Sequence, residues 1–76
     1  MKDFATLKNE ISKTLGSLVG SVKVSLYEDK FFKDKFYIVE CLNWGDFIEC
    51  GKLLESNDAL KSIGDGMFNC YYVEYK

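Results

Sequence analysis

Few residues in this chain could do chemistry. Two pairs of carboxylates are close in sequence, Asp46 with Glu49 and Glu28 with Asp29. The chain has no histidine, which excludes a Ser-His or Cys-His nucleophile and a histidine general base. Asp46 and Glu49 have the spacing of a helix capping box, and Glu28 with Asp29 is typical of a solvated turn. We therefore expect no enzymatic activity and assign no catalytic residue.

The three cysteines also argue against a reactive or metal-binding site. Cys41, Cys50 and Cys70 are nine and twenty residues apart, without a Cys-x-x-Cys spacing. An odd number at these distances does not indicate a disulfide framework, and a zinc site would lack its histidine ligand. Gly64-Asp65-Gly66 is too short for a phosphate-binding loop. We expect thiols that pack as small hydrophobic groups, with no metal and no cofactor.

The charge of the chain is nearly balanced, with ten lysines against twelve aspartates and glutamates and a formal net charge of −2. Nucleic-acid affinity depends largely on phosphate neutralisation, and the absence of arginine removes the bidentate phosphate and guanine contact. We therefore expect no sequence-specific nucleic-acid binding. No apolar segment has the length of a membrane span, and residues 1–6 lack a signal-peptide pattern, which predicts a cytoplasmic protein without membrane contact.

Two helices are expected to position these residues. Phe4–Val19 repeats apolar residues at spacings of three and four, with Asp3 as its N-cap and Gly20 at its end. Asp46 and Glu49 open a second helix, which Ser56-Asn57-Asp58 either kinks or restarts before Ala59, Leu60 and Ile63. The 76 residues are 47% hydrophobic, which is compatible with one small domain over residues 1–76.

Three strands complete the expected fold. Ser21–Tyr27 alternates apolar and polar residues, and Phe36–Leu42 is β-branched and aromatic, so the two are expected to form an antiparallel hairpin. Met67–Tyr75 is expected to follow as a parallel strand after a right-handed crossover through the second helix. The order α-β-β-α-β, without an internal repeat, predicts an α+β domain with a three-stranded sheet packed against two helices.

The second of these strands is apolar on both faces. One face presents Phe36, Ile38, Glu40 and Leu42, and the other presents Tyr37, Val39 and Cys41. Such strands are usually covered on both sides, so the helices either cover both faces or share one. Small α+β domains tend to place their helices on one side, which would leave an aromatic face exposed. On the third strand that face presents either Tyr71, Val73 and Tyr75 or Phe68, Cys70 and Tyr72.

An exposed aromatic face predicts a non-catalytic protein-binding module that occludes a site on a larger partner. Tyrosine is favoured at interface hot spots. The expected anchors are Tyr37, Tyr71 and Tyr75, with Phe31 and Phe32 as a second candidate. The acidic residues Glu28, Asp29 and Asp34 would meet a basic nucleic-acid-binding surface of a protein or protein–nucleic-acid complex. By analogy of size and slight acidity, the chain suggests a phage or mobile-element inhibitor of a host defence complex, of the anti-CRISPR type.

Several alternatives stay open at this stage. An immunity protein or antitoxin would bind its toxin by the same physics. A homodimer would bury the aromatic face against itself. The segment Lys30–Tyr37 interleaves aromatic and basic residues, as in a hairpin that stacks single-stranded nucleic acid, although ordinary alternation of strand faces also explains it. The tyrosines near the C-terminus also simply suit a β-strand.

Overall fold

The computed structural model describes residues 4–29, 31 and 34–76. The elements run in the order η1 (Phe4–Thr6), α1 (Leu7–Leu15), η2 (Gly16–Ser21), β1 (Val22–Asp29), β2 (Asp34–Cys41), α2 (Trp44–Glu55), β3 (Leu60–Asp65) and β4 (Cys70–Tyr75). The strands form one antiparallel sheet in the order β1-β2-β4-β3. The expected α+β class is confirmed. The expected three strands and α-β-β-α-β order are wrong, because the chain folds as α-β-β-α-β-β.

The additional strand is β3, in a segment expected to be helical. Asn57 ends the helical path: its side-chain amide donates to Thr14 Oγ1 (2.9 Å) and to Glu10 Oε1 (3.2 Å) on α1. Its Oδ1 accepts the backbone N–H of Ala59 at 3.0 Å, which turns the chain. β3 then pairs with β4, so the last strand runs antiparallel to β2 rather than parallel.

Both helices differ from expectation at their ends. Gly16 has φ +59°, a left-handed conformation favourable for glycine, and it ends α1 four residues before the expected Gly20. The expected N-cap Asp3 lies outside the described residues. α2 begins at Trp44 because Asn43 is its N-cap, with Oδ1 accepting the N–H of Asp46 at 2.8 Å. Asp46 instead lies in the first turn, where a carboxylate interacts favourably with the helix dipole.

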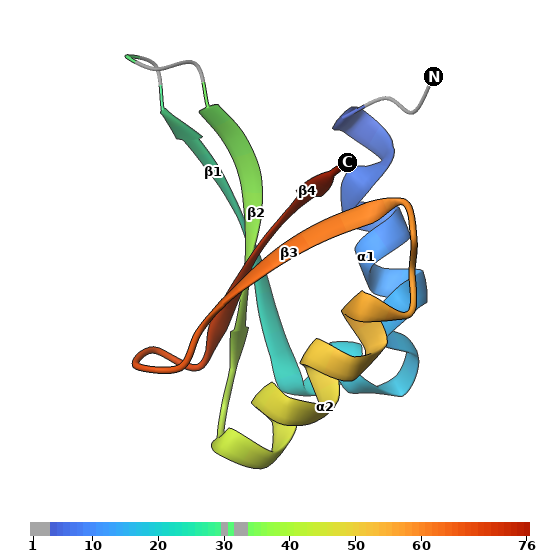
Figure 1. The fold of residues 1–76 in the computed structure, drawn as a ribbon, viewed down its shortest axis with the longest axis vertical. Helices are drawn as coiled ribbons and strands as arrows, with labels where there is room; N and C mark the ends of the chain where they lie inside the picture. The colour runs from blue at the N-terminus through green and yellow to red at the C-terminus, as the bar shows by residue number, and fades with distance from the viewer. Residues whose placement is uncertain (1–3, 30, 32–33) are drawn as a thin grey trace.

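α1 and α2 lie on the same side of the sheet, and no helix of the described residues covers the other side (Figure 1). The shared-face arrangement favoured from the sequence is therefore the one observed. Between the layers lies a core whose buried members are Leu7, Ile11, Leu15, Val39, Cys41, Phe47, Cys50, Leu54, Leu60 and Val73. We call the side of the sheet that faces this core the inner face, and the uncovered side the outer face.

Tyr71 on β4 holds α2 against the inner face by two contacts with Phe47. Its ring stacks on Phe47 with centroids 4.5 Å apart, and its hydroxyl donates to the Phe47 carbonyl at 3.0 Å. The ring lies between two glycines, Gly51 on α2 and Gly64 on β3. A Cβ at Gly64 would lie 2.8 Å from Tyr71 Cε1, and a Cβ at Gly51 would overlap the Tyr71 hydroxyl. The absence of side chains at these two positions is what lets the tyrosine lie flat in the core.

An internal twofold relation connects the two hairpins of the sheet, β1-β2 and β3-β4. Ile38 and Tyr72 are direct partners on the two central strands. Rotation about an axis through this pair exchanges β1-β2 with β3-β4, and it superposes identical residues: Tyr37 on Tyr71, Val39 on Val73, Glu40 on Glu74, and Lys23 on Lys61. The chain is built from two α-β-β units.

The contact between Gly51 and Tyr71 can be tested by a double-mutant cycle. Gly→Ala inside a helix ordinarily gains about 1 kcal/mol. Here we expect Gly51→Ala to lower the free energy of unfolding by about 1–2 kcal/mol, because the new methyl group displaces the Tyr71 hydroxyl from its hydrogen bond. Urea denaturation of Gly51→Ala, Tyr71→Phe and the double variant measures the coupling. Gly51→Ala should cost less in the Tyr71→Phe background, and strictly additive effects would contradict the packing described here.

Candidate protein-docking surface

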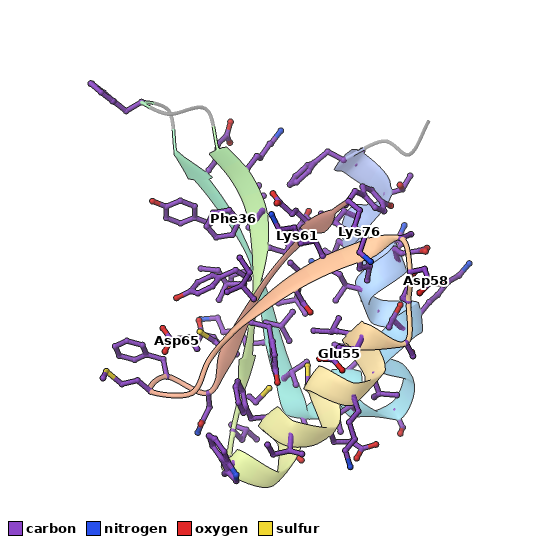
Figure 2. All side chains as sticks on the ribbon, viewed as in Figure 1. Phe36, Glu55, Asp58, Lys61, Asp65 and Lys76 are labelled. Carbon is purple, nitrogen blue, oxygen red and sulfur yellow. The ribbon has the colours of Figure 1, made fainter. Side chains whose placement is uncertain are left out.

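By the strand register, the described side chains of the outer face come from all four strands. They are Lys23, Ser25 and Tyr27 of β1, Phe36, Ile38 and Glu40 of β2, Cys70, Tyr72 and Glu74 of β4, and Lys61, Ile63 and Asp65 of β3. Figure 2 shows Phe36 and Asp65 on the side of the sheet away from the helices, whereas Glu55 lies on the helix side. Cys70 is buried among its neighbours, and no helix of the described part of the chain covers the rest of this array.

An apolar band crosses the outer face. Tyr27 stacks on Phe36 with ring centroids 4.7 Å apart, and Phe36 meets Tyr72 edge-on at 5.6 Å. Ile38 and Ile63 lie on either side of Tyr72 in the strand register. Ile63 is 57% exposed, while Phe36, Ile38 and Tyr72 are half-buried by one another. Strand pairing and ring contacts together hold these side chains in place.

Tyr72 separates two open hollows of about 310 Å³ each. The first hollow is lined by Phe36, Lys61, Ile63, Tyr72 and Glu74. The second hollow is lined by Ile38, Glu40, Phe68, Cys70 and Tyr72. Both have apolar or aromatic walls and one carboxylate at the rim. Each of these shallow hollows is large enough to receive a side chain of another protein.

The two hollows differ in charge. In the first, Lys61 Nζ lies 3.6 Å from Glu74 Oε1, so the carboxylate is already paired. In the second, the exposed Glu40 faces Lys23 across the β1–β2 ladder, but no ion pair within 4.0 Å joins them in the described chain. The internal twofold relation thus places an equivalent Lys and Glu beside each hollow. Only Lys61 and Glu74 form an ion pair within 4.0 Å among the described residues.

The β3–β4 turn extends the outer face with two exposed apolar side chains. Met67 is 85% exposed and Phe68 is 69% exposed. Asp65 shapes the turn: its Oδ1 accepts the N–H of Met67 at 3.1 Å, and its carbonyl accepts the N–H of Phe68 at 3.3 Å. Asp65 Oδ2 also accepts the Tyr72 hydroxyl at 3.3 Å. One carboxylate therefore ties the turn to the apolar band.

The three expected tyrosine anchors lie on the inner face, so their expected exposure is wrong. Tyr37 stacks on Phe4 at 5.4 Å, Tyr71 packs on Phe47, and the Tyr75 hydroxyl lies 2.8 Å from Thr6 Oγ1. All three pack against the core. The alternative set expected for this strand, Phe68, Cys70 and Tyr72, is the one on the outer side.

The remaining candidate residues that the structure describes lie at the far end of the β1–β2 hairpin. Phe31 is 88% exposed there, and Phe32 lies outside the described residues. Glu28 is exposed, and Asp29 is the direct partner of Asp34 in the strand register. The fold therefore brings the three acidic residues to one hairpin end. The residues that sequence reasoning missed are Tyr27 and Ile63; Ile63 had been assigned to a helix.

The described hairpin does not form one aromatic stacking platform. Phe36 points to the outer face, whereas Tyr37 points to the inner face. Lys35 lies over the Phe4 ring, with Nζ 4.7 Å from the centroid, and is thus occupied within the fold. The alternation of faces expected for an ordinary hairpin accounts for these residues.

The cysteines are buried and free. Burial raises the pKa of Cys41 and raises that of Cys50 to about 12, so both thiols stay protonated near neutral pH. Among the described residues, no group of three or more histidine, cysteine or acidic side chains is placed to hold a metal ion. No helix in the described ranges has the length and hydropathy of a membrane span.

The environment of Tyr72 gives a prediction in alkaline solution. Its hydrogen bond with Cys70, the charge of Cys70 and burial, together with Asp65, raise the pKa of Tyr72 to about 12. A tyrosine in an unfolded chain titrates near 10. The folded state therefore favours neutral Tyr72, and this stabilisation is present below about pH 10 and is lost as the pH rises toward 12.

Asp65→Asn tests this account because asparagine keeps the Oδ1 acceptor for Met67 and removes the charge. We expect the Tyr72 pKa to fall by the smaller part that Asp65 contributes, while the larger contribution of Cys70 stays in place. The Tyr72 signal is the difference in absorbance at 295 nm between titrations with and without the change Tyr72→Phe. Glu49→Gln, an exposed change on α2, is the control and should leave this signal in place. An unchanged Tyr72 pKa in the Asp65→Asn protein would contradict the contact.

The comparisons with known proteins found no match for this chain. No family model matches the chain, and neither a curated protein nor a solved structure does. The features of the described chain that bear on its function are the outer face and the β3–β4 turn.

Proposed function

We propose that this chain is a non-catalytic protein-binding module whose outer face docks on a larger protein and covers a site there. The observation that carries the proposal is the continuous apolar band on a sheet face that no element of the described chain covers. Contiguous apolar patches on small soluble domains usually mark interaction sites. Aromatic rings held by neighbouring rings lose little freedom on binding, which favours affinity.

The size of the face indicates how much of the surface a partner has to contact. Four strands at about 4.8 Å and five residues at about 3.3 Å give an area of roughly 20 × 17 Å. This flat area is below the ~800 Å² that each side of a standard interface buries. Met67 and Phe68 lie at the edge of the face and add exposed apolar area. We therefore expect the partner to contact the β3–β4 turn together with the sheet.

The charges around the face favour a partner with basic groups. The array holds two lysines, Lys23 and Lys61, against three acidic residues, Glu40, Asp65 and Glu74, which is a net charge of −1. The hairpin end adds further acidic residues to the same sheet. Such a surface attracts a basic region such as a nucleic-acid-binding site on a protein. We include in this proposal that the larger protein belongs to a host defence complex in the cytoplasm, and that the bound chain inhibits it.

Two matched substitutions separate docking by the outer face from general stickiness. Ile63→Lys places a charge in the apolar band, and Ile48→Lys makes the same change on α2, where the isoleucine is 40% exposed. Each tagged protein is used to capture partners from lysates of candidate hosts, with quantitative mass spectrometry of what is retained. We expect Ile63→Lys to reduce the stoichiometric partner at least tenfold and Ile48→Lys to leave it unchanged.

Thermal unfolding of both variants checks that each is folded before capture. Equal capture by the Ile63→Lys and wild-type proteins would contradict the outer face as the docking surface. Sedimentation of the free protein at micromolar concentration distinguishes a partner from self-association. A dimer that Ile63→Lys dissolves would replace the proposal with the homodimer alternative.

A further inference from the structure

We propose that the outer face receives an amphipathic helix of the partner, with an apolar side chain in the first hollow and a lysine or arginine side chain in the second. This inference rests on the proposed docking function and specifies its partner. It follows from three features of the face: the spacing of the hollows, the kind of backbone an open sheet face accepts, and the unpaired carboxylate of Glu40.

The spacing of the hollows matches one turn of a helix. Both hollows share Tyr72 as a wall and follow one another along the strands, the first beside Phe36 and Ile63 and the second beside Ile38 and Cys70. Phe36 and Ile38 are two residues apart on one strand, a distance of about 6.6 Å. Side chains at positions i and i+4 of a helix rise about 6 Å along its axis and point the same way. A helix lying along the strands therefore fills both hollows.

A helix is also the backbone that suits this face. The central strands β2 and β4 already use their backbone groups within the sheet, so the face offers side chains but no ladder of free backbone donors and acceptors. An extended peptide laid across it would bury its own N–H and C=O groups without partners, which is costly. A helix satisfies those groups internally. It would repeat on the outer face the helix-on-sheet packing of the inner face.

The second hollow selects a basic side chain. Its walls include the rings of Phe68 and Tyr72, whose faces attract a cation. The exposed Glu40 carboxylate lies at its rim and forms no ion pair within 4.0 Å in the described chain. The first hollow differs, because Lys61 already neutralises its carboxylate at 3.6 Å. An aliphatic stem against the rings with its charge at Glu40 fits the second hollow, and an uncharged apolar side chain fits the first.

Synthetic helical peptides test this inference without knowledge of the partner. Probe one is an alanine-based, side-chain-stapled helix with Leu at position i and Arg at i+4. Probe two carries Glu in place of Arg, and probe three carries the same Leu and Arg on opposite sides of the helix. Each is titrated into the full ¹⁵N-labelled chain, followed by NMR. We expect probe one to shift the amide signals of Ile38, Ile63, Phe68 and Tyr72, and to bind at least fivefold more tightly than the others.

Variants of the chain locate the charge contact. Glu40→Gln should weaken probe one by about three- to fivefold, the value of one exposed ion pair, and should not weaken probe two, whose own carboxylate is repelled by Glu40. Glu49→Gln on α2 is the matched control and should change nothing. Equal binding of probes one and two, or shifts confined to α1 and α2, would overturn the inference. If the probes fail while Ile63→Lys still abolishes capture of a partner, the docking face stands and the basic helical occupant is wrong.

Discussion

The structure depends on the space that two glycines leave for the ring of Tyr71. Gly51 and Gly64 come from a helix and from an edge strand, and the tyrosine ring between them fixes how α2, β3 and β4 lie relative to one another. Its hydroxyl is satisfied by the Phe47 carbonyl, so a polar group enters the core without an unpaired donor. Once Tyr71 points inward, strand alternation sends Tyr72 outward. The packing of the core therefore decides which tyrosine the surface presents.

The internal twofold relation explains the charge pattern of the outer face. In both units the second strand reads Tyr-x-Val-Glu, so Tyr37 and Tyr71 pack inward with valines while Glu40 and Glu74 point outward. Their partners on the edge strands are Lys23 and Lys61. The two units differ at the central position, where one has Ile38 and the other has Tyr72. Departures from the repeat, rather than the repeat itself, produce the two unequal hollows.

Sequence patterns predicted the parts of the fold that depend on local periodicity. The apolar stripe of the first helix and the alternation of the β1–β2 hairpin are both present. β3 was missed because the Asn57 side chain bonds to Glu10 and Thr14, which are more than forty residues away, and no local pattern encodes that tether. The face of each tyrosine was missed for a similar reason. Tyr71 and Tyr72 have equal propensity for a strand, and only the distant glycines distinguish them.

The outer face can stay apolar because it is already half-packed. Phe36 packs against both Tyr27 and Tyr72, so the Phe36 and Tyr72 rings are already half-buried in the free protein. Exposed apolar area stays at Tyr27, at Ile63 on the edge strand and at the β3–β4 turn. Asp65 bonds this turn to Tyr72, the register partner of Ile63. The partner that we propose would thus meet a pre-formed surface, and none of its binding energy would be spent on ordering the sheet.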